Sequence, residues 1–230
     1  MANVFNINIP ATPLKFYNSD AKKQNKAALD RIYNKYKTDI DNAAALTNVP
    51  KDIITSFIFI ESNGNPDIVS PAGAIGLMQL MTSSSDILVI ENKKERLQQP
   101  EKDALTKYLG KRFTDGILKM KYLGDPKTVD GITYDGTKQR YLTKADLVKP
   151  ALNILMGAIY LGILIDESTK NGKVNLHKVV VRYNRGYFAD KKGASIPDTI
   201  EDSVTNMNTE SKNYILKLMG VNGTLDTLIA

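Results

Sequence analysis

The stretch Pro150-Ala-Leu-Asn-Ile-Leu-Met-Gly-Ala-Ile-Tyr-Leu-Gly-Ile-Leu-Ile165 contains the longest apolar run of the chain, residues 154–165. Pro150 suits the first turn of a helix, where the missing N–H costs nothing. The run has 12 residues, whereas a helix needs about 20 apolar residues to cross a bilayer. The stretch therefore predicts a helix buried at the centre of a globular domain, with Asn153 as a structural hydrogen-bonding residue, and it predicts no membrane span.

Helical periodicity continues on both sides of this central helix. Before it, a first helix with Ser19 or Asp20 as its cap is predicted by apolar side chains three and four positions apart, namely Leu29, Ile32, Tyr33, Tyr36, Ile40 and Ala43. Asn48 is a candidate cap for a second helix that ends at Gly64. After it, residues 210–219 predict a short final helix. The segment 176–183 has helical spacing, although its three consecutive valines also fit a strand.

Residues 83–149 have a different character. A charged helix is expected over 91–110, and the pairs Asp130-Gly131 and Asp135-Gly136 are turn signals of a β-hairpin within 129–142. We expect these residues to form an added lobe beside the central helix. The predicted fold class is α+β, predominantly α-helical, with a small β-hairpin lobe.

Composition excludes several classes of protein. Of the 230 residues, 42% are hydrophobic and 24% charged, which is ordinary for a soluble globular chain. There is no cysteine, and the single histidine, His177, is expected at the surface because its apolar neighbours define the buried side of their helix. Thiolate and multi-histidine metal sites are therefore excluded, and we expect no metal and no cofactor. The net charge of +6 favours an anionic partner, but no interleaving of basic and aromatic residues points to nucleic acid.

Glu61 is the candidate for chemistry. It follows Phe57 by four positions and Ile54 by seven, so a helix places its carboxyl on the same apolar face, at the C-terminal end. Burial and the negative helix end both disfavour the charged form and raise the pKa. A glutamate that stays protonated near neutral pH can serve as a general acid. The alternative is a residue that ends the helix and points to solvent.

The residues around Glu61 form a long motif. Glu61-Ser-Asn-Gly-Asn-Pro66 is followed by Ser70-Pro-Ala-Gly-Ala-Ile-Gly-Leu-Met-Gln-Leu-Met81, and this pattern closely resembles the soluble lytic transglycosylase family. Three later blocks resemble the family in the same order: Pro150-Ala-Leu-Asn-Ile154, Tyr183-Asn-Arg-Gly186 and Glu210-Ser-Lys-Asn-Tyr-Ile215. The resemblance covers about 48–81 and 150–218. It implies a lysozyme-like fold and an enzyme that cleaves the glycan strands of peptidoglycan.

The resemblance also assigns residues. It implies that Glu61 is the sole catalytic acid and base, and that the substrate-binding residues are Ser70, Gln79, Met81, Tyr183 and Asn184. The Tyr183 hydroxyl is expected near the catalytic carboxyl. Taken alone, Ser70 is typical of a turn, Gln79 and Met81 of core or edge positions, and Tyr183 of a core. The chain departs from the family pattern at Thr82, Lys149 and Arg185, none of which is a proposed catalytic position.

The implied reaction needs one carboxyl. Glu61 would protonate the oxygen that leaves N-acetylmuramic acid and then deprotonate the C6 hydroxyl, which closes on C1 to give a 1,6-anhydro end. One alternative is a hydrolysing lysozyme of the same fold, with a water held by Asp67 or Asp86. The other is a non-catalytic wall-binding protein.

The organisation expected from these observations is a lead-in over 1–18, one lysozyme-like domain over 19–220 with an inserted lobe at about 83–149, and a C-terminal tail over 221–230. Residues 1–10 contain no secretory signal. A bacteriophage enzyme is therefore expected, acting from the virion or in the host cell envelope, with peptidoglycan and other virion proteins as partners. A bacterial periplasmic enzyme is the alternative.

Overall fold

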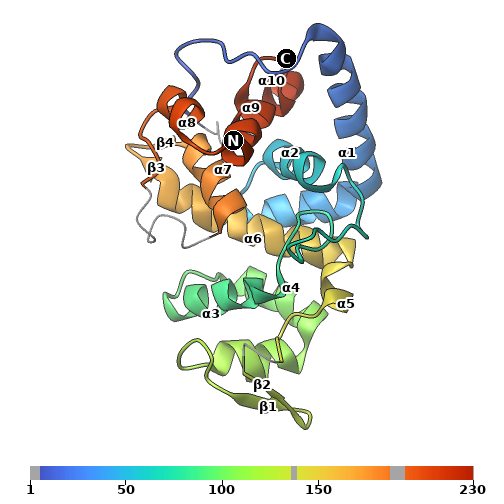
Figure 1. Ribbon diagram of the computed structural model, residues 1–230. Helices are drawn as coiled ribbons and strands as arrows, with labels where there is room; N and C mark the ends of the chain where they lie inside the picture. Colours follow the sequence, from blue (N-terminus) through green and yellow to red (C-terminus); the bar gives the residue numbers. More distant parts are fainter. Residues whose placement is uncertain (1–5, 136–138, 187–194, 230) are drawn as a thin grey trace.

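The computed structural model describes residues 6–135, 139–186 and 195–229 (Figure 1). The helices are α1 (Ser19–Thr47), α2 (Lys51–Ser62), α3 (Ser85–Lys93), α4 (Gln99–Leu109), α5 (Lys144–Leu147), α6 (Pro150–Ser168), α7 (Leu176–Arg185), α8 (Ile200–Asn206), α9 (Thr209–Met219) and α10 (Thr224–Ile229). Short helical turns are η1 (Thr82–Ser84), η2 (Arg112–Gly116) and η3 (Ile117–Lys119). Two antiparallel hairpins are formed by β1 (Lys127–Val129) with β2 (Ile132–Tyr134), and by β3 (Thr169–Lys170) with β4 (Lys173–Val174). The predicted class, α+β and predominantly helical, is confirmed.

The centre of the molecule is α6, which crosses it between two groups of elements. In Figure 1, α1, α2 and α7–α10 lie above α6, and α3, α4, β1 and β2 lie below it. Among the described residues, α6 alone has the length and mean hydropathy of a membrane span, yet 78% of that apolar window is buried inside the fold. The prediction of a buried central helix is confirmed.

The first helix, α1, bends at Tyr36, whose φ of −113° and ψ of 20° are not helical. One arm is upright in Figure 1 and the other lies against α6. The predicted cap is wrong by a residue, because Asn18 accepts a hydrogen bond from the Ala21 N–H at 2.9 Å. Asn48 does not cap α2; it ends α1 in the left-handed conformation, with φ at 56°. The buried stripe includes five of the six predicted positions, namely Leu29, Ile32, Tyr36, Ile40 and Ala43.

Within the predicted lobe, α3 and α4 lie below α6, and the hairpin of β1 and β2 is farthest from it (Figure 1). The single helix predicted over 91–110 is wrong: α3 and α4 are separated by a break around Leu97, which turns into the core. Arg96 at this break forms ion pairs with buried Glu91 and with Glu167 of α6. A new helix begins here because Pro100 lies in the first turn of α4 and Gln98 forms a capping box with Glu101.

The turn between β1 and β2 is Asp130-Gly131, with φ at 50° and 80°, as the turn signal predicted. Both residues adopt the left-handed conformation that a two-residue hairpin loop requires. The strands end at Tyr134, so the hairpin is shorter than 129–142. The second predicted turn, Asp135-Gly136, lies partly outside the described residues.

The C-terminal third is helical. The three consecutive valines, residues 179–181, also fitted a strand, but they lie fully buried in α7. The prediction of a helix is confirmed. His177, expected at the surface, is fully buried, and its Nε2 lies 3.2 Å from the carbonyl oxygen of Pro197. Residues 195–200 cover a second face of α7, which local spacing does not reveal. The segment predicted as a tail contains α10, which packs against α1.

Candidate active site

Glu61 lies in the last turn of α2, and its carboxyl is largely enclosed. Burial raises the pKa of Glu61 to about 7; the nearby Glu210 charge adds to this, while a hydrogen bond from Tyr214 and the charge of Lys217 oppose it. The fully buried ring of Phe57, one turn earlier, packs against the rings of Tyr183 at 4.9 Å and Tyr214 at 5.5 Å. The apolar face expected beside Glu61 is therefore aromatic.

The hydroxyl of Tyr214 donates a hydrogen bond of 2.7 Å to Glu61 Oε1. Burial and the Glu61 charge raise the pKa of Tyr214 well above its ordinary value, so the hydroxyl keeps its proton and remains a donor. Sequence reasoning missed this residue, although it lies in the quoted Glu210-Ser-Lys-Asn-Tyr-Ile215 block. The long sequence separation from Glu61 hid the contact.

Tyr183 has a different partner from the one we expected. Its hydroxyl donates to the carbonyl oxygen of Met78 at 2.7 Å rather than to Glu61. The Tyr183 side chain is buried, and the Glu61 charge contributes to the raised pKa of its hydroxyl. The Tyr183 side chain thus lies near the Glu61 carboxyl, but its hydroxyl bonds to the loop that follows Glu61 in the sequence.

This loop, residues 63–81, is fastened to α6 by Asn153. The Asn153 side chain accepts from Met78 N–H at 2.8 Å and donates to the carbonyl oxygens of Ile75 at 3.0 Å and Leu147 at 2.8 Å. A Cβ on Gly76 would lie 2.5 Å from the Leu147 carbonyl oxygen, so only glycine permits this approach. Asn153 is the structural hydrogen-bonding residue that the sequence predicted.

Glu61 opens into a cavity of about 640 Å³ between this loop, the start of α3 and the end of α7. All of the predicted substrate-binding residues line the cavity together with Glu61, namely Ser70, Gln79, Met81, Tyr183 and Asn184. Two further carboxyls, Asp86 and Glu210, line it as well. The structure therefore brings the predicted residues together but does not leave Glu61 as the lone carboxyl there.

Several of these side chains are held by local bonds. Ser70 Oγ accepts from Ala74 N–H at 3.0 Å, a turn contact. Gln79, at φ 46°, donates through Nε2 to the Gly76 carbonyl oxygen at 2.9 Å. Asn184 donates to Glu210 Oε1 at 2.9 Å. Met81 is 41% exposed and offers an apolar surface to whatever fills the cavity.

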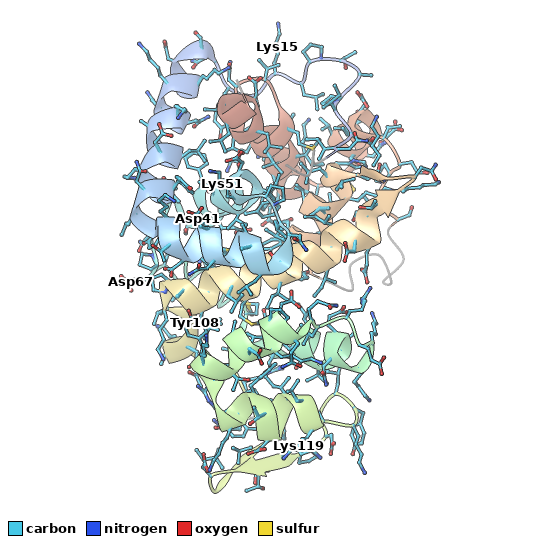
Figure 2. All side chains as sticks on the ribbon, turned by 180° about the vertical axis from the view of Figure 1, so that it is seen from behind. Lys15, Asp41, Lys51, Asp67, Tyr108 and Lys119 are labelled. Atoms are coloured by element: carbon cyan, nitrogen blue, oxygen red, sulfur yellow. The ribbon has the colours of Figure 1, made fainter. Side chains whose placement is uncertain are left out.

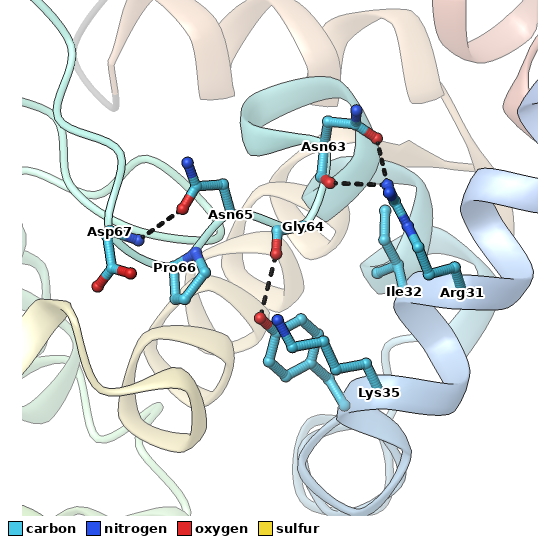
Figure 3. Close-up of a pocket in the computed structure, with 9 residues that line it drawn as sticks. Arg31, Ile32, Lys35, Asn63, Gly64, Asn65, Pro66 and Asp67 are labelled. Carbon is cyan, nitrogen blue, oxygen red and sulfur yellow. Dashed lines mark hydrogen bonds between the residues drawn. The ribbon is translucent and has the colours of Figure 1, made fainter.

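Asp67 and Asp86, the two carboxylates considered as holders of a hydrolytic water, lie in different cavities. Asp86 lines the Glu61 cavity, burial raises its pKa, and Arg140 donates to its Oδ2 at 3.3 Å. Asp67 is exposed, lies at the edge of the molecule in Figure 2, and lines a second cavity, drawn in Figure 3. Only Asp86 remains a candidate for such a water. Within the described parts of the chain, no group of three or more Asp, Glu or His side chains could hold a metal ion.

The profile of the family described as "Transglycosylase SLT domain" matches residues 39–116. This range includes Glu61, Ser70, Gln79 and Met81 but ends before Tyr183 and Tyr214. The match and the mostly helical architecture agree with the lysozyme-like fold that we predicted.

The chain is also similar to proteins named "Endo-type membrane-bound lytic murein transglycosylase A", from Klebsiella pneumoniae subsp. pneumoniae and from Salmonella paratyphi B. In both cases it is 30% identical over 149 residues, which is 64% of this chain and 52% of the relative. The chain thus spans about half the length of the curated relatives it matches.

Proposed function

We propose that this chain is a peptidoglycan lytic transglycosylase that cleaves the β-1,4 bond between N-acetylmuramic acid and N-acetylglucosamine, with Glu61 as the single general acid and base. The observation that carries the proposal is the state of Glu61. Burial raises its pKa to about 7, it faces a cavity of about 640 Å³, and it lies in the segment that the transglycosylase profile matches.

In the first step, the protonated carboxyl of Glu61 gives its proton to the glycosidic oxygen. The bond between that oxygen and C1 of the muramic sugar breaks, and its electron pair stays with the departing oxygen. The N-acetyl group of the same sugar stabilises the positive charge at C1. A pKa near 7 keeps a large share of Glu61 protonated at neutral pH, as a general acid requires.

In the second step, the ionised Glu61 takes the proton of the C6 hydroxyl. The oxygen then bonds to C1, and the 1,6-anhydro ring closes without water. The Tyr214 hydroxyl supports the first step, because its hydrogen bond to Oε1 stabilises the carboxylate that proton transfer leaves on Glu61. Glu61 ends the cycle protonated.

The rest of the cavity binds the glycan in this proposal. Gln79, Ser70 and Asn184 offer polar groups to the sugar hydroxyl and acetamido groups, and the exposed Met81 contacts a sugar face. Tyr183 acts through the loop, since its hydroxyl holds the Met78 carbonyl next to Gln79. In this proposal the unit that folds and acts is the predicted 19–220 together with α10, and 83–149 is a lobe that supplies Ser83 and Asp86 to the cavity.

Digestion of purified peptidoglycan in ¹⁸O-labelled water, followed by mass spectrometry, tests the reaction. The expected products end in 1,6-anhydro-N-acetylmuramic acid, which is one water lighter than the hydrolytic product, carries no label and is not reduced by borohydride. Glu61→Gln should release none of them.

A second function has one observation in its favour, since Asp86 shares the cavity and could hold a water for hydrolysis. Labelled, reducible muramic acid as the main product would show that the chain is a hydrolysing lysozyme and not a transglycosylase. Asp86→Asn would then be the next variant to test. Binding to the wall without any new sugar ends would leave a non-catalytic wall protein.

The proposed place of action is the cell envelope, where the substrate is. A bacteriophage virion is the proposed source and the bacterial periplasm its alternative. Detection of the chain in purified phage particles, as opposed to periplasmic extracts of uninfected cells, decides between them.

A further inference from the structure

A second cavity, of about 390 Å³, lies between α1 and the segment directly after α2 (Figure 3). Its walls are residues of α1 around the bend and residues of the loop, namely Arg31, Ile32, Lys35, Tyr36 and 63–67. None of these residues lines the cavity of Glu61. The position is still close in sequence to that site, because Asn63 follows Glu61 by two residues.

Two cations reach into this cavity from one face of α1. Arg31 and Lys35 are four positions apart on the helix, and in Figure 3 both extend toward the loop. Arg31 is held in place by hydrogen bonds from Nη2 to the Asn63 carbonyl oxygen at 3.1 Å and to Asn63 Oδ1 at 2.9 Å. Over residues 6–135, 139–186 and 195–229, no ion pair neutralises either cation.

The rest of the lining adds donors and one carboxylate. Asn65 uses its Oδ1 to accept from Asp67 N–H at 3.1 Å, which leaves its amide N–H groups as donors. Asp67 is the one carboxylate of the lining, and it lies at the opposite end of the view from Arg31 (Figure 3). The cavity therefore has a cationic end and an anionic end.

We propose that this cavity binds the stem peptide of peptidoglycan, with a peptide carboxylate at Arg31 and Lys35 and a free side-chain amine at Asp67. Stem peptides carry both groups, and charged hydrogen bonds to carboxylates are the strong ones. The choice of this peptide rests on the proposed function, which brings a glycan strand to the neighbouring cavity.

The distance is compatible with one substrate in both cavities. Asp67 precedes Ser70 by three residues, and three residues span at most about 11 Å of extended chain, whereas a four-residue peptide spans about 14 Å. A peptide attached to a sugar beside Ser70 can therefore reach Asp67 and the space beyond it. The cavity would make the chain prefer peptide-bearing glycan over bare glycan.

Calorimetric titration of the full chain with a stem tetrapeptide, freed from its glycan by an amidase, tests the site. Lys35→Glu should weaken binding about fivefold, since it turns an exposed attraction to a carboxylate into repulsion. The matched control is Lys23→Glu, the same charge change on an exposed residue of the same helix that lines no described cavity, and it should bind as wild type does. Thermal unfolding checks that each variant is folded.

A second titration tests the anionic end. Both peptides compared carry an acetylated α-amine, which replaces the lactyl amide lost on release from the glycan. Wild type should bind the one with a free side-chain amine more tightly than the one in which that amine is also acetylated, and Asp67→Asn should lose this preference. Equal affinities of Lys35→Glu and Lys23→Glu, or inorganic phosphate competing as well as the peptide, would overturn the proposal. The titration reads binding and no cleavage, so its outcome is independent of whether the chain cuts glycan.

Discussion

Burial of the Glu61 carboxyl has a cost that depends on pH. Its pKa is about 7 in the folded chain against an ordinary value of 4.5, so between these values the unfolded chain loses the proton and the folded chain keeps it. The contribution of Glu61 to the free energy of unfolding therefore falls as pH rises from 4.5 to 7 and stays level above that.

Glu61→Gln should remove this dependence and the activity together. Near pH 8 the variant should be more stable than wild type by about 2–3 kcal/mol, and near pH 4 the two should be alike. Turnover should fall at least ~10³-fold, since the proton donor and acceptor are both lost. Urea denaturation at both pH values and a peptidoglycan assay measure this. Retention of a tenth of the turnover would take Glu61 out of the mechanism.

Tyr214→Phe should shift the pH profile. In wild type the Tyr214 hydrogen bond lowers the pKa of Glu61. Its removal should therefore move the alkaline limb of the kcat/KM profile to higher pH by about one pH unit. Tyr183→Phe is the matched control, because its hydroxyl bonds the Met78 carbonyl instead. That variant should reduce turnover through the loop and leave the limb in place. The same shift in both variants would contradict a specific role for Tyr214.

At the scale of elements, the contact between α6 and the loop 63–81 depends on a glycine. A Cβ on Gly157 would lie 2.3 Å from Met78 Sδ and 2.7 Å from its Cε, and Met78 is fully buried. Gly157→Ala should destabilise the fold by about 2 kcal/mol, since overpacking forces Met78 to move. Turnover should fall with it, because Gln79 is the next residue.

Gly162 on the same helix provides the control. Its Cβ would meet Val49 Cγ2 at 3.6 Å, an ordinary contact, and alanine is a better helix former than glycine. Gly162→Ala should therefore raise stability by up to about 1 kcal/mol. Both values come from chemical denaturation. If the two variants are equally stable, the close approach of Met78 to α6 does not constrain the loop.

Elements whose burial pattern is local could be predicted from the sequence. The apolar run after Pro150 predicted α6, and Asn153 in the first turn of that buried helix was predicted to form hydrogen bonds, because a buried amide needs partners. The turn of β1 and β2 follows from Asp130-Gly131. The break between α3 and α4 also has a local signal that our prediction overlooked, because Pro100 fits the first turn of a new helix and Gln98 forms a capping box with Glu101. Only the pairing of Arg96 with Glu167 in a distant helix could not be predicted.

The residues of the candidate site also divide into those that a local sequence pattern predicts and those that depend on distant contacts. The Glu61 motif is one continuous stretch, so its helix, its loop and the raised pKa could be argued from spacing. Tyr214 and the environment of His177 depend on contacts between distant segments: Glu61 with α9, and α7 with residues 195–200. Helical periodicity identifies the buried face of one helix, but it does not predict which distant segments pack against its other faces.

At the scale of the whole molecule, the net charge of +6 should govern attachment to the wall. Two of the lysines, Lys15 and Lys119, lie at opposite ends of the molecule in Figure 2. Binding to intact anionic wall should weaken as salt rises, because screening acts over about 8 Å at physiological ionic strength. A pull-down across salt concentrations measures this, with wall stripped of anionic polymer as control. Binding that does not change with salt concentration would indicate that shape and hydrogen bonding, and not charge, attach the chain to the wall.

The hydrogen bond from Tyr214 to Glu61 joins residues 153 positions apart. At the usual rate of synthesis, roughly 8–30 s separate the appearance of these two residues on the ribosome. During that interval α2 can form, but the nascent chain has neither the hydroxyl that holds the carboxyl nor the α7 end that closes the cavity. The surroundings of the Glu61 carboxyl are therefore complete only after both α7 and α9 have been synthesised.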